Sequence, residues 1–207
     1  MIKNIIFDLG GVIASLDRDR AIDRFRQLGL PDADQVIGLY GHKGIMMGIE
    51  DGSLTKAQFY DAFRQQAGKD IPDEDICHAW MGIITDVPVE KLEYITQLRK
   101  QYPVYLLSNT NPVIMDYWAF TSRFSAAGKP IRDYFDKMYL SYEMKLVKPD
   151  PAIFHAMIQD TSIRPEESVF IDDSKPNVTT AESLGFHTLQ PINNEDWRDE
   201  LSALLEK

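Results

Sequence analysis

The chain has 207 residues, which is long for one simple domain and short for two full ones, so a core with a smaller inserted domain is expected. A composition of 44% hydrophobic and 26% charged residues is typical of an ordinary globular protein and excludes a disordered one. The formal net charge of −10 argues against a nucleic-acid partner, because binding to a phosphate backbone needs clustered lysines and arginines. A small anionic ligand stays compatible with this charge if positive charge is concentrated locally.

The sequence also narrows the cellular setting. Cys77 is the single cysteine, so no intramolecular disulfide can form and a reducing compartment is the simplest setting. No apolar run reaches the ~20 residues of a membrane span, and the first apolar run lacks the pattern of a signal peptide. We therefore expect a cytoplasmic protein with no membrane partner, present as a monomer or weak homodimer.

The first element in chain order is a short buried strand. An apolar run at residues 3–8 ends in the carboxylate of Asp8, and Gly10 and Gly11 follow it. This order is typical of a strand that stops in a loop.

The next part of the chain is helical in period. Residues 17–88 show no comparable apolar run, and their apolar residues recur at helical spacing. Thr55 with Gln58 three residues later predicts the start of a helix with a capping box. The sequence therefore predicts a small inserted helical-bundle cap over residues 17–88, on a core formed by residues 1–16 and 89–207.

The core resumes with alternating strands and helices. A helix is expected at 91–99, further strands at 104–107, 138–140, 168–171 and 186–189, and an amphipathic helix at 194–207. Strands separated by helical segments predict an α/β fold, a Rossmann-like parallel sheet with flanking helices. In such sheets ligands bind beyond the carboxyl ends of the strands.

Polar side chains mark these strand ends. Asp8 follows the first strand, Ser108 and Asn109 follow the second, and Asp172 and Asp173 follow the fourth. Carboxylate oxygens are suitable ligands for Mg²⁺, and hydroxyl and amide groups can donate to phosphoryl oxygens. The pattern therefore predicts a shared site for a phosphate group and a divalent cation.

Three segments carry a family resemblance. They are FDLGGVI at 7–13, LSNTN at 107–111, and VKPDPAIF followed by FIDDSKPN between 147 and 177. In this order they resemble the four motifs of the haloacid dehalogenase-like hydrolases, most of which are magnesium-dependent phosphatases. Within that superfamily the chain is similar to bacterial α-D-glucose-1-phosphate phosphatases, including the Asp17-x-x-Arg20 pattern and Trp80, and to β-phosphoglucomutase-like proteins.

The resemblance assigns roles to the marked residues. Asp8 is the expected nucleophile, which would form an aspartyl phosphate and split the hydrolysis into two displacements. Lys148 is expected to neutralise charge on both the nucleophile and the phosphate, with Ser108 and Asn109 binding the phosphoryl group. The expected ligands of Mg²⁺ are Asp8, the backbone carbonyl of Gly10, Asp173 and Asp172, and Asn177 resembles the position that orients the metal-site loop.

Gly10 departs from the family pattern. Most phosphatases of the group carry a second aspartate there, which protonates the leaving group and then activates water, a contribution of ~10²- to 10⁴-fold. Asp17 and Asp19 are the nearest carboxylates that could substitute, although capping of the following helix explains both equally.

The insert is expected to determine specificity. Arg20 is the predicted substrate contact, because a guanidinium can grip phosphate or sugar hydroxyls bidentately. His42 and Lys43 are further candidates that simple exposure also explains. Gly48-x-Glu50-x-Gly52 is a candidate that a turn explains, and Trp80 is interpreted as a core residue.

The predicted function is a Mg²⁺-dependent phosphatase that hydrolyses a small phosphorylated metabolite, specifically a sugar phosphate, through an aspartyl phosphate. Two alternatives stay open. One is a weak or inactive phosphosugar-binding homologue, because Gly10 lacks the acid. The other is a 2-haloacid dehalogenase, against which the acidic pair counts, since that chemistry needs no metal.

Overall fold

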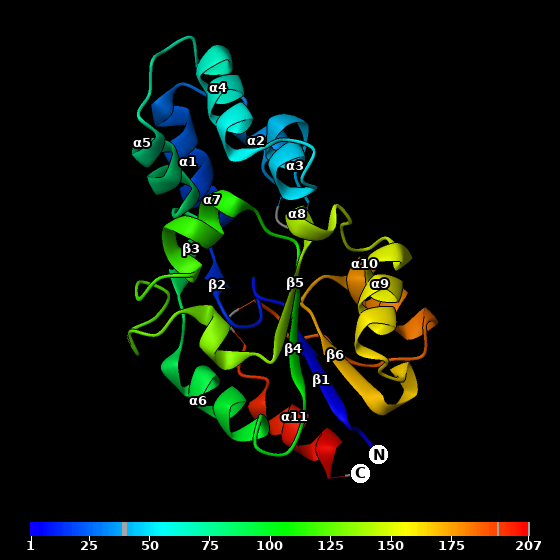
Figure 1. Cartoon of the computed structure of the whole chain (residues 1–207). Coiled ribbons are helices and arrows are strands. Elements are labelled where there is room, and N and C mark those ends of the chain that lie inside the picture. Colours follow the sequence, from blue (N-terminus) through cyan, green and yellow to red (C-terminus); the bar gives the residue numbers. More distant parts are fainter. Residues whose placement is uncertain (39–40, 194, 207) are drawn as a thin grey trace.

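The computed structural model of the chain describes residues 1–38, 41–193 and 195–206. At its centre lies a parallel five-stranded sheet in the order β5-β4-β1-β6-β7 (Figure 1). The parallel α/β sheet predicted from the sequence is confirmed. The strands are β1 (Asn4–Phe7), β4 (Val104–Ser108), β5 (Lys137–Leu140), β6 (Ser168–Ile171) and β7 (His187–Leu189).

Helices cover both faces of this sheet, which explains why its central strands β4, β1 and β6 carry uninterrupted apolar runs. Successive side chains of β1 point to opposite faces, so Ile5 and Phe7 pack in one cluster and Ile6 in another. The first cluster contains residues of α6 (Val89–Leu98) and α11 (Arg198–Leu205), and the second contains residues of α9 (Pro151–Thr161) and α10 (Lys175–Ser183). Figure 1 shows these two helix pairs on opposite sides of the strands.

A group of helices lies above the carboxyl ends of the strands (Figure 1). The capping box predicted at Thr55 and Gln58 is present at the start of α4. The boundaries 17–88 for this insert stay a prediction, and residues 39 and 40 within it lie outside the described residues. The helices are α1 (Arg18–Leu28), α2 (Ala33–Val36), α3 (Gly44–Glu50), α4 (Lys56–Ala67) and α5 (Asp73–Trp80).

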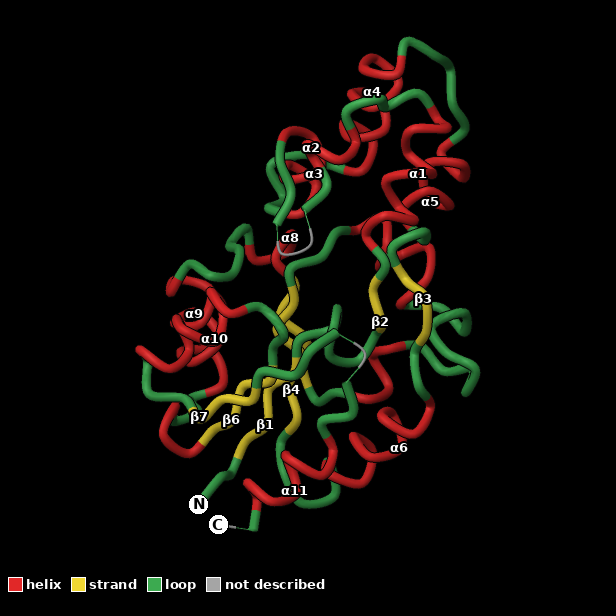
Figure 2. The backbone as a smooth tube through the Cα atoms, turned by 180° about the vertical axis from the view of Figure 1, so that it is seen from behind, coloured by secondary structure: helices red, strands yellow, loops and turns green. Residues whose placement is uncertain are grey.

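Two short strands join the helical group to the core. β2 (Ser15–Leu16) pairs with β3 (Ile84–Asp86) in an antiparallel ladder, and both lie between the helical group and the sheet (Figure 2). The expectation that no strand occurs between 16 and 89 is therefore wrong at β3. The segment has three residues, two of them exposed, so it lacks the buried apolar run that identified the other strands.

Short elements complete the core. Aromatic side chains pack near residue 118, where Trp118 is buried and its ring centroid lies 5.1 Å from that of Phe124. The predicted C-terminal helix is α11, and residues 194 and 207 of its predicted range lie outside the described residues. None of the helices among the described residues is long and apolar enough to cross a membrane. The remaining elements are α7 (Pro112–Ile114), a π-helical turn (Met115–Ala119), 3₁₀ turns (Ile131–Tyr134 and Pro165–Glu167) and α8 (Ser141–Met144).

Candidate active site

The predicted carboxylates meet at the carboxyl ends of β1 and β6. One oxygen from each of Asp8, Asp172 and Asp173 lies within 4.8 Å of the others. The Asp8 amide donates to Ile171 O at 2.9 Å, so pairing with β6 continues to the residue that carries the carboxylate. The rigid sheet therefore fixes the backbone on which the acidic cluster is built.

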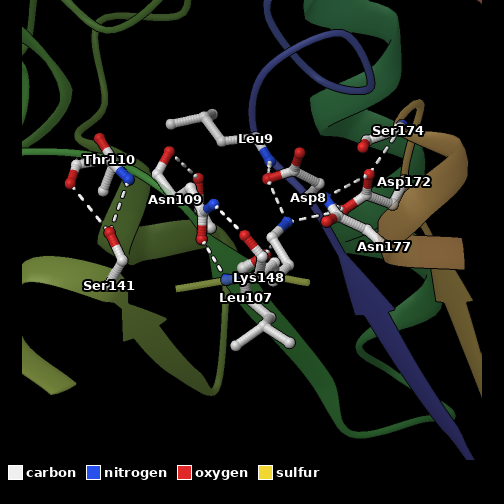
Figure 3. Close-up of polar contacts among 11 residues, drawn as sticks. Asp8, Leu9, Leu107, Asn109, Thr110, Ser141, Lys148, Asp172, Ser174 and Asn177 are labelled. Atoms are coloured by element: carbon white, nitrogen blue, oxygen red, sulfur yellow. Dashed lines mark hydrogen bonds and ion pairs between the residues drawn. The ribbon is translucent and has the colours of Figure 1, made fainter. Parts of the chain in front are cut away.

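Lys148 lies between two of these carboxylates. Its side chain is fully buried, and Nζ lies 3.0 Å from Asp8 Oδ1 and 2.6 Å from Asp172 Oδ2 (Figure 3). A third contact, from Nζ to Leu107 O at 2.8 Å, ties the ammonium to the end of β4. Burial alone would lower the pKa of Lys148, but Asp172 and Asp8 outweigh it and raise that pKa, so the ammonium stays charged.

Asn109 fixes the backbone of Lys148. Its Oδ1 accepts from the Lys148 amide at 2.8 Å, and its Nδ2 donates to the Lys148 carbonyl at 2.9 Å (Figure 3). The side chain predicted to bind phosphate is therefore engaged in positioning the lysine. Ser108 is also buried and lines the same pocket as Asn109.

Asp172 is a fully satisfied carboxylate. Besides Lys148, it accepts from the Ser174 amide at 2.8 Å and from Asn177 Nδ2 at 3.0 Å (Figure 3). Asn177 thus holds the Asp172 side chain in place. Its role in orienting a metal-site loop stays a prediction. Both Asp172 oxygens are already occupied by these donors.

The Asp173 carboxylate, unlike that of Asp172, is not fully hydrogen-bonded. Its Oδ2 is buried and has no hydrogen-bond partner among the described residues. Gly11 packs against this oxygen so closely that a Cβ at position 11 would lie 2.1 Å from it. An unpaired buried carboxylate oxygen is costly unless a cation binds it, so the donor set fits the predicted Mg²⁺.

The net charge of the cluster also fits a divalent cation. Three carboxylates face one ammonium, which leaves a formal excess of two negative charges. Burial, partly opposed by Lys148, raises the pKa of Asp8 to about 6. Burial and the neighbouring carboxylates raise the pKa of Asp173 to about 7. A divalent cation would balance the charge and return both groups to their ionised forms.

A pocket with a volume of about 100 Å³ opens over the cluster. Asp8, Gly10 and Asp173 line its floor, and the pocket continues to the helical group. Both contacts of the Asp8 carboxylate, to the Leu9 amide at 2.7 Å and to Lys148, fall on Oδ1. Among the described residues Oδ2 has no such partner.

Three residues of the helical group line the same pocket. Glu50, the last residue of α3, is 5% exposed, and its Oε1 has no hydrogen-bond partner among the described residues. Its Oε2 lies 3.4 Å from His42 Nε2. Trp80 is buried as predicted, but it also lines the pocket with an unpartnered Nε1. The sequence offered Glu50 as a candidate substrate contact within a stretch that a turn also explains, whereas the structure places it at the end of α3.

The candidates around α1 lie outside this pocket. Asp17 is the N-cap of α1 and accepts from the Arg20 amide at 3.0 Å, so the Asp17-x-x-Arg20 pattern has a local structural role. Arg20 is exposed, and its Nη1 lies 3.5 Å from Ile84 O. Asp19 is also exposed. Neither Asp17 nor Asp19 lines the pocket beside Gly10, so neither takes the place of the missing second aspartate.

Comparisons with known proteins support this arrangement. The family model for haloacid dehalogenase-like hydrolases matches residues 2–185. The chain is 46% identical over 205 residues to D-ribitol-5-phosphate phosphatase of Bacteroides thetaiotaomicron, covering 99% of both proteins. A haloacid dehalogenase-like family hydrolase from Porphyromonas gingivalis superposes with a TM-score of 0.95 at 39% identity, over 100% of this chain and 99% of the other. A haloacid dehalogenase family enzyme of B. thetaiotaomicron, solved with magnesium and inorganic phosphate, superposes with a TM-score of 0.83 at 40% identity. This match covers 95% of this chain and 98% of the other.

Proposed function

Because the chain belongs to the haloacid dehalogenase-like hydrolase family, we propose that it is a Mg²⁺-dependent phosphatase for a small phosphorylated sugar or polyol. The observation that carries the proposal is the unpaired Asp173 oxygen beside Asp8 and Lys148 in one pocket. In this arrangement Asp8 would be the nucleophile, Lys148 supplies a fixed positive charge, and the unpaired Asp173 oxygen can bind a cation. All three line the pocket that would hold the phosphoryl group. The relative with 46% identity acts on D-ribitol 5-phosphate, which is a linear polyol phosphate.

The reaction starts with attack by Asp8. Its free Oδ2 forms a bond to phosphorus while the bond from phosphorus to the ester oxygen breaks, which leaves an aspartyl phosphate. Asp8, Asp173 and the Gly10 carbonyl would hold Mg²⁺, which would supply the charge neutralisation that allows two anions to approach. Lys148 also stabilises the negative charge on Asp8 and the phosphoryl group, since its Nζ is fixed between Asp8 and Asp172. Water then attacks phosphorus and releases Asp8.

The wall of the pocket supports a polyol or sugar as the leaving group. Glu50, His42 and Trp80 offer polar atoms in a setting that is otherwise apolar, with Ile83 and Ile84 beside them. Hydroxyl groups can both donate and accept, so they can satisfy unpaired groups such as Trp80 Nε1. An unsubstituted alkyl chain would leave those groups unpaired.

A phosphate-release screen tests this proposal. Wild-type protein is assayed with sugar phosphates, polyol phosphates including D-ribitol 5-phosphate, nucleotides and pyrophosphate, with Mg²⁺ and with a chelator. We expect release only with Mg²⁺, and the highest kcat/KM on a sugar or polyol phosphate. Asp8→Asn should abolish release, and Asp19→Asn, the same change at an exposed position, should not.

Two results would contradict the proposal. Activity on a 2-haloacid that a chelator does not affect would identify a dehalogenase. Thermal stabilisation by sugar phosphates without phosphate release from any substrate would identify a non-catalytic binding protein.

A further inference from the structure

The proposed reaction lacks a proton donor on the core side of the pocket. Gly10 has no side chain, and Asp17 and Asp19 lie outside the pocket. Among the described residues that line the pocket, the carboxyl groups are those of Asp8, Asp173 and Glu50. Asp8 is the proposed nucleophile and Asp173 a proposed cation ligand, so Glu50 is the carboxyl group without a role.

We propose that Glu50, delivered by α3, donates the proton to the leaving oxygen and so replaces the acid that Gly10 cannot supply. This inference rests on the proposed phosphatase activity. It assigns a catalytic group to the helical insert, in the same pocket as the nucleophile.

Contacts at His42 indicate the position of the proton on Glu50. The Gly38 amide donates to His42 Nδ1 at 3.2 Å, so in a neutral imidazole the proton is on Nε2. Nε2 lies 3.4 Å from Glu50 Oε2, so the protonated ring nitrogen is beside that oxygen. The acid proton therefore belongs on Oε1, the buried atom with no partner among the described residues.

Burial keeps both Glu50 and His42 neutral near pH 7. Burial raises the pKa of Glu50 to about 8; Lys148 opposes this rise, and Asp8 and Asp51 add to it. Burial, with a smaller contribution from Arg18, lowers the pKa of His42 to about 4. A protonated carboxyl group at neutral pH is the form that a general acid requires.

Glu50 is held at the core through its backbone. Ser141 Oγ, at the end of β5, lies 2.7 Å from Glu50 O. The same Oγ accepts from the Thr110 amide at 3.0 Å, in the loop that follows β4 (Figure 3). Because Thr110 and Ser108 belong to one loop, the proton donor and the proposed phosphate-binding residues are connected through one hydroxyl.

The proton balance is complete without another reactant. As Asp8 Oδ2 bonds to phosphorus and the ester bond breaks, the proton on Glu50 Oε1 passes to the departing oxygen and yields an alcohol. Glu50 is then a carboxylate. It takes a proton from water as the water oxygen attacks phosphorus, and cleavage of the bond to Asp8 restores both starting groups.

The test compares leaving groups. Wild type, Glu50→Gln and Glu74→Gln are assayed on phosphate monoesters whose leaving groups range from an alkyl alcohol to a nitrophenol. Glu74 is exposed in α5 and does not line the pocket, so Glu74→Gln is the matched control. A poor leaving group needs the proton and a nitrophenolate does not. We therefore expect Glu50→Gln to lose roughly 100-fold in kcat on the alkyl ester and less than about threefold on the nitrophenyl ester.

The pH profile provides a second readout. Wild-type kcat/KM on the alkyl ester should fall as pH rises through about 8, the pKa of Glu50, because the donor loses its proton. Glu50→Gln should not show this fall. Equal losses on all esters, or a change confined to KM, would overturn the inference and make Glu50 a structural or binding residue. Such a result leaves the phosphatase proposal intact, whereas inactivity of wild type on every sugar and polyol phosphate would contradict that proposal first.

Discussion

Lys148 is the residue that makes the buried acidic cluster compatible with folding. Its Nζ pairs with Asp8 and Asp172 at a site where none of the three side chains is more than 13% exposed. Breaking a buried ion pair by removing one partner leaves an uncompensated charge, which costs about 3–5 kcal/mol. The same charge is the one that the proposed reaction uses.

We therefore expect Lys148→Met to lower the free energy of unfolding by about 3–5 kcal/mol and to abolish phosphate release. Urea unfolding of the metal-free protein measures the first effect. Lys137→Met is the matched control, because Lys137 forms an exposed pair with Asp160, and it should change stability little. A Lys148 variant as stable as wild type would contradict the account of the cluster.

Gly11 makes a separate prediction about the metal site. It adopts a φ of +74°, and a Cβ there would lie 2.1 Å from Asp173 Oδ2. Gly11→Ala should displace that carboxylate and weaken Mg²⁺ binding about 10- to 100-fold, as other changes that misorient a ligand do. Isothermal titration with Mg²⁺ measures the affinity.

Gly128 provides the control for Gly11. Its φ is +69°, but a Cβ there would meet no atom within 4 Å. Gly128→Ala should therefore carry the backbone strain, roughly 1–2 kcal/mol, without any change in Mg²⁺ affinity. Equal effects of the two substitutions on Mg²⁺ binding would show that strain alone accounts for the loss.

At the scale of elements, the turn between α3 and α4 holds the insert against α8. Gly52 adopts a φ of +72°, and a Cβ there would lie 2.2 Å from Tyr142 O. Gly52→Ala should push the turn away from α8 and move Glu50 from the pocket, because Ser141 of α8 contacts Glu50 O. We expect a lower kcat on sugar or polyol phosphates.

The control for this prediction is Gly68→Ala. Gly68 is the C-cap of α4 with a φ of +63°, and a Cβ there would meet nothing within 4 Å. This variant should keep wild-type kcat. If both variants were equally active, contact between the turn and α8 would not position Glu50.

Elements that bury continuous apolar runs could be predicted from the sequence, and elements defined by tertiary contacts could not. All five strands of the sheet were predicted, most directly the central strands β1, β4 and β6, which carry apolar runs because helices cover both faces of the sheet. The family resemblance is confirmed by the model that matches residues 2–185. β3 was missed because its pairing with β2 depends on a residue pair about 70 positions apart.

The same distinction applies to the site. The proximity of Asp8 and Asp173 could be predicted because each closely follows a strand end, where local sequence determines position. Lys148 lies beyond α8 and was marked by the family resemblance. The hydrogen bonds from Asn109 to Lys148 and from Ser141 to Glu50 span 39 and 91 positions, so no local pattern reports them. Arg20 of the Asp17-x-x-Arg20 pattern was predicted to contact the substrate. In the structure this segment instead forms the N-terminal cap of α1, outside the pocket.

At the scale of the whole molecule, the proton and the divalent cation compete for the same buried carboxylates. In the metal-free protein the pKa of Asp8 is raised from 3.8 to about 6, and that of Asp173 from 3.8 to about 7. Glu50 is raised from 4.5 to about 8. The folded state therefore binds more protons than the unfolded state between about pH 4 and 8. Its stability falls as pH rises through that range.

Magnesium should reverse much of this loss. Above about pH 7, Asp8 and Asp173 are ionised and the cation binds them without displacing protons, whereas at pH 5 it must displace a proton from each. We expect the rise in Tm on adding Mg²⁺ to be large at pH 8 and small at pH 5, as measured by differential scanning calorimetry. Asp173→Asn should reduce the gain at pH 8, and Glu50→Gln should leave it unchanged because Glu50 is not a proposed ligand. A gain from Mg²⁺ that is equal at both pH values would mean that the cation binds elsewhere than at these carboxylates.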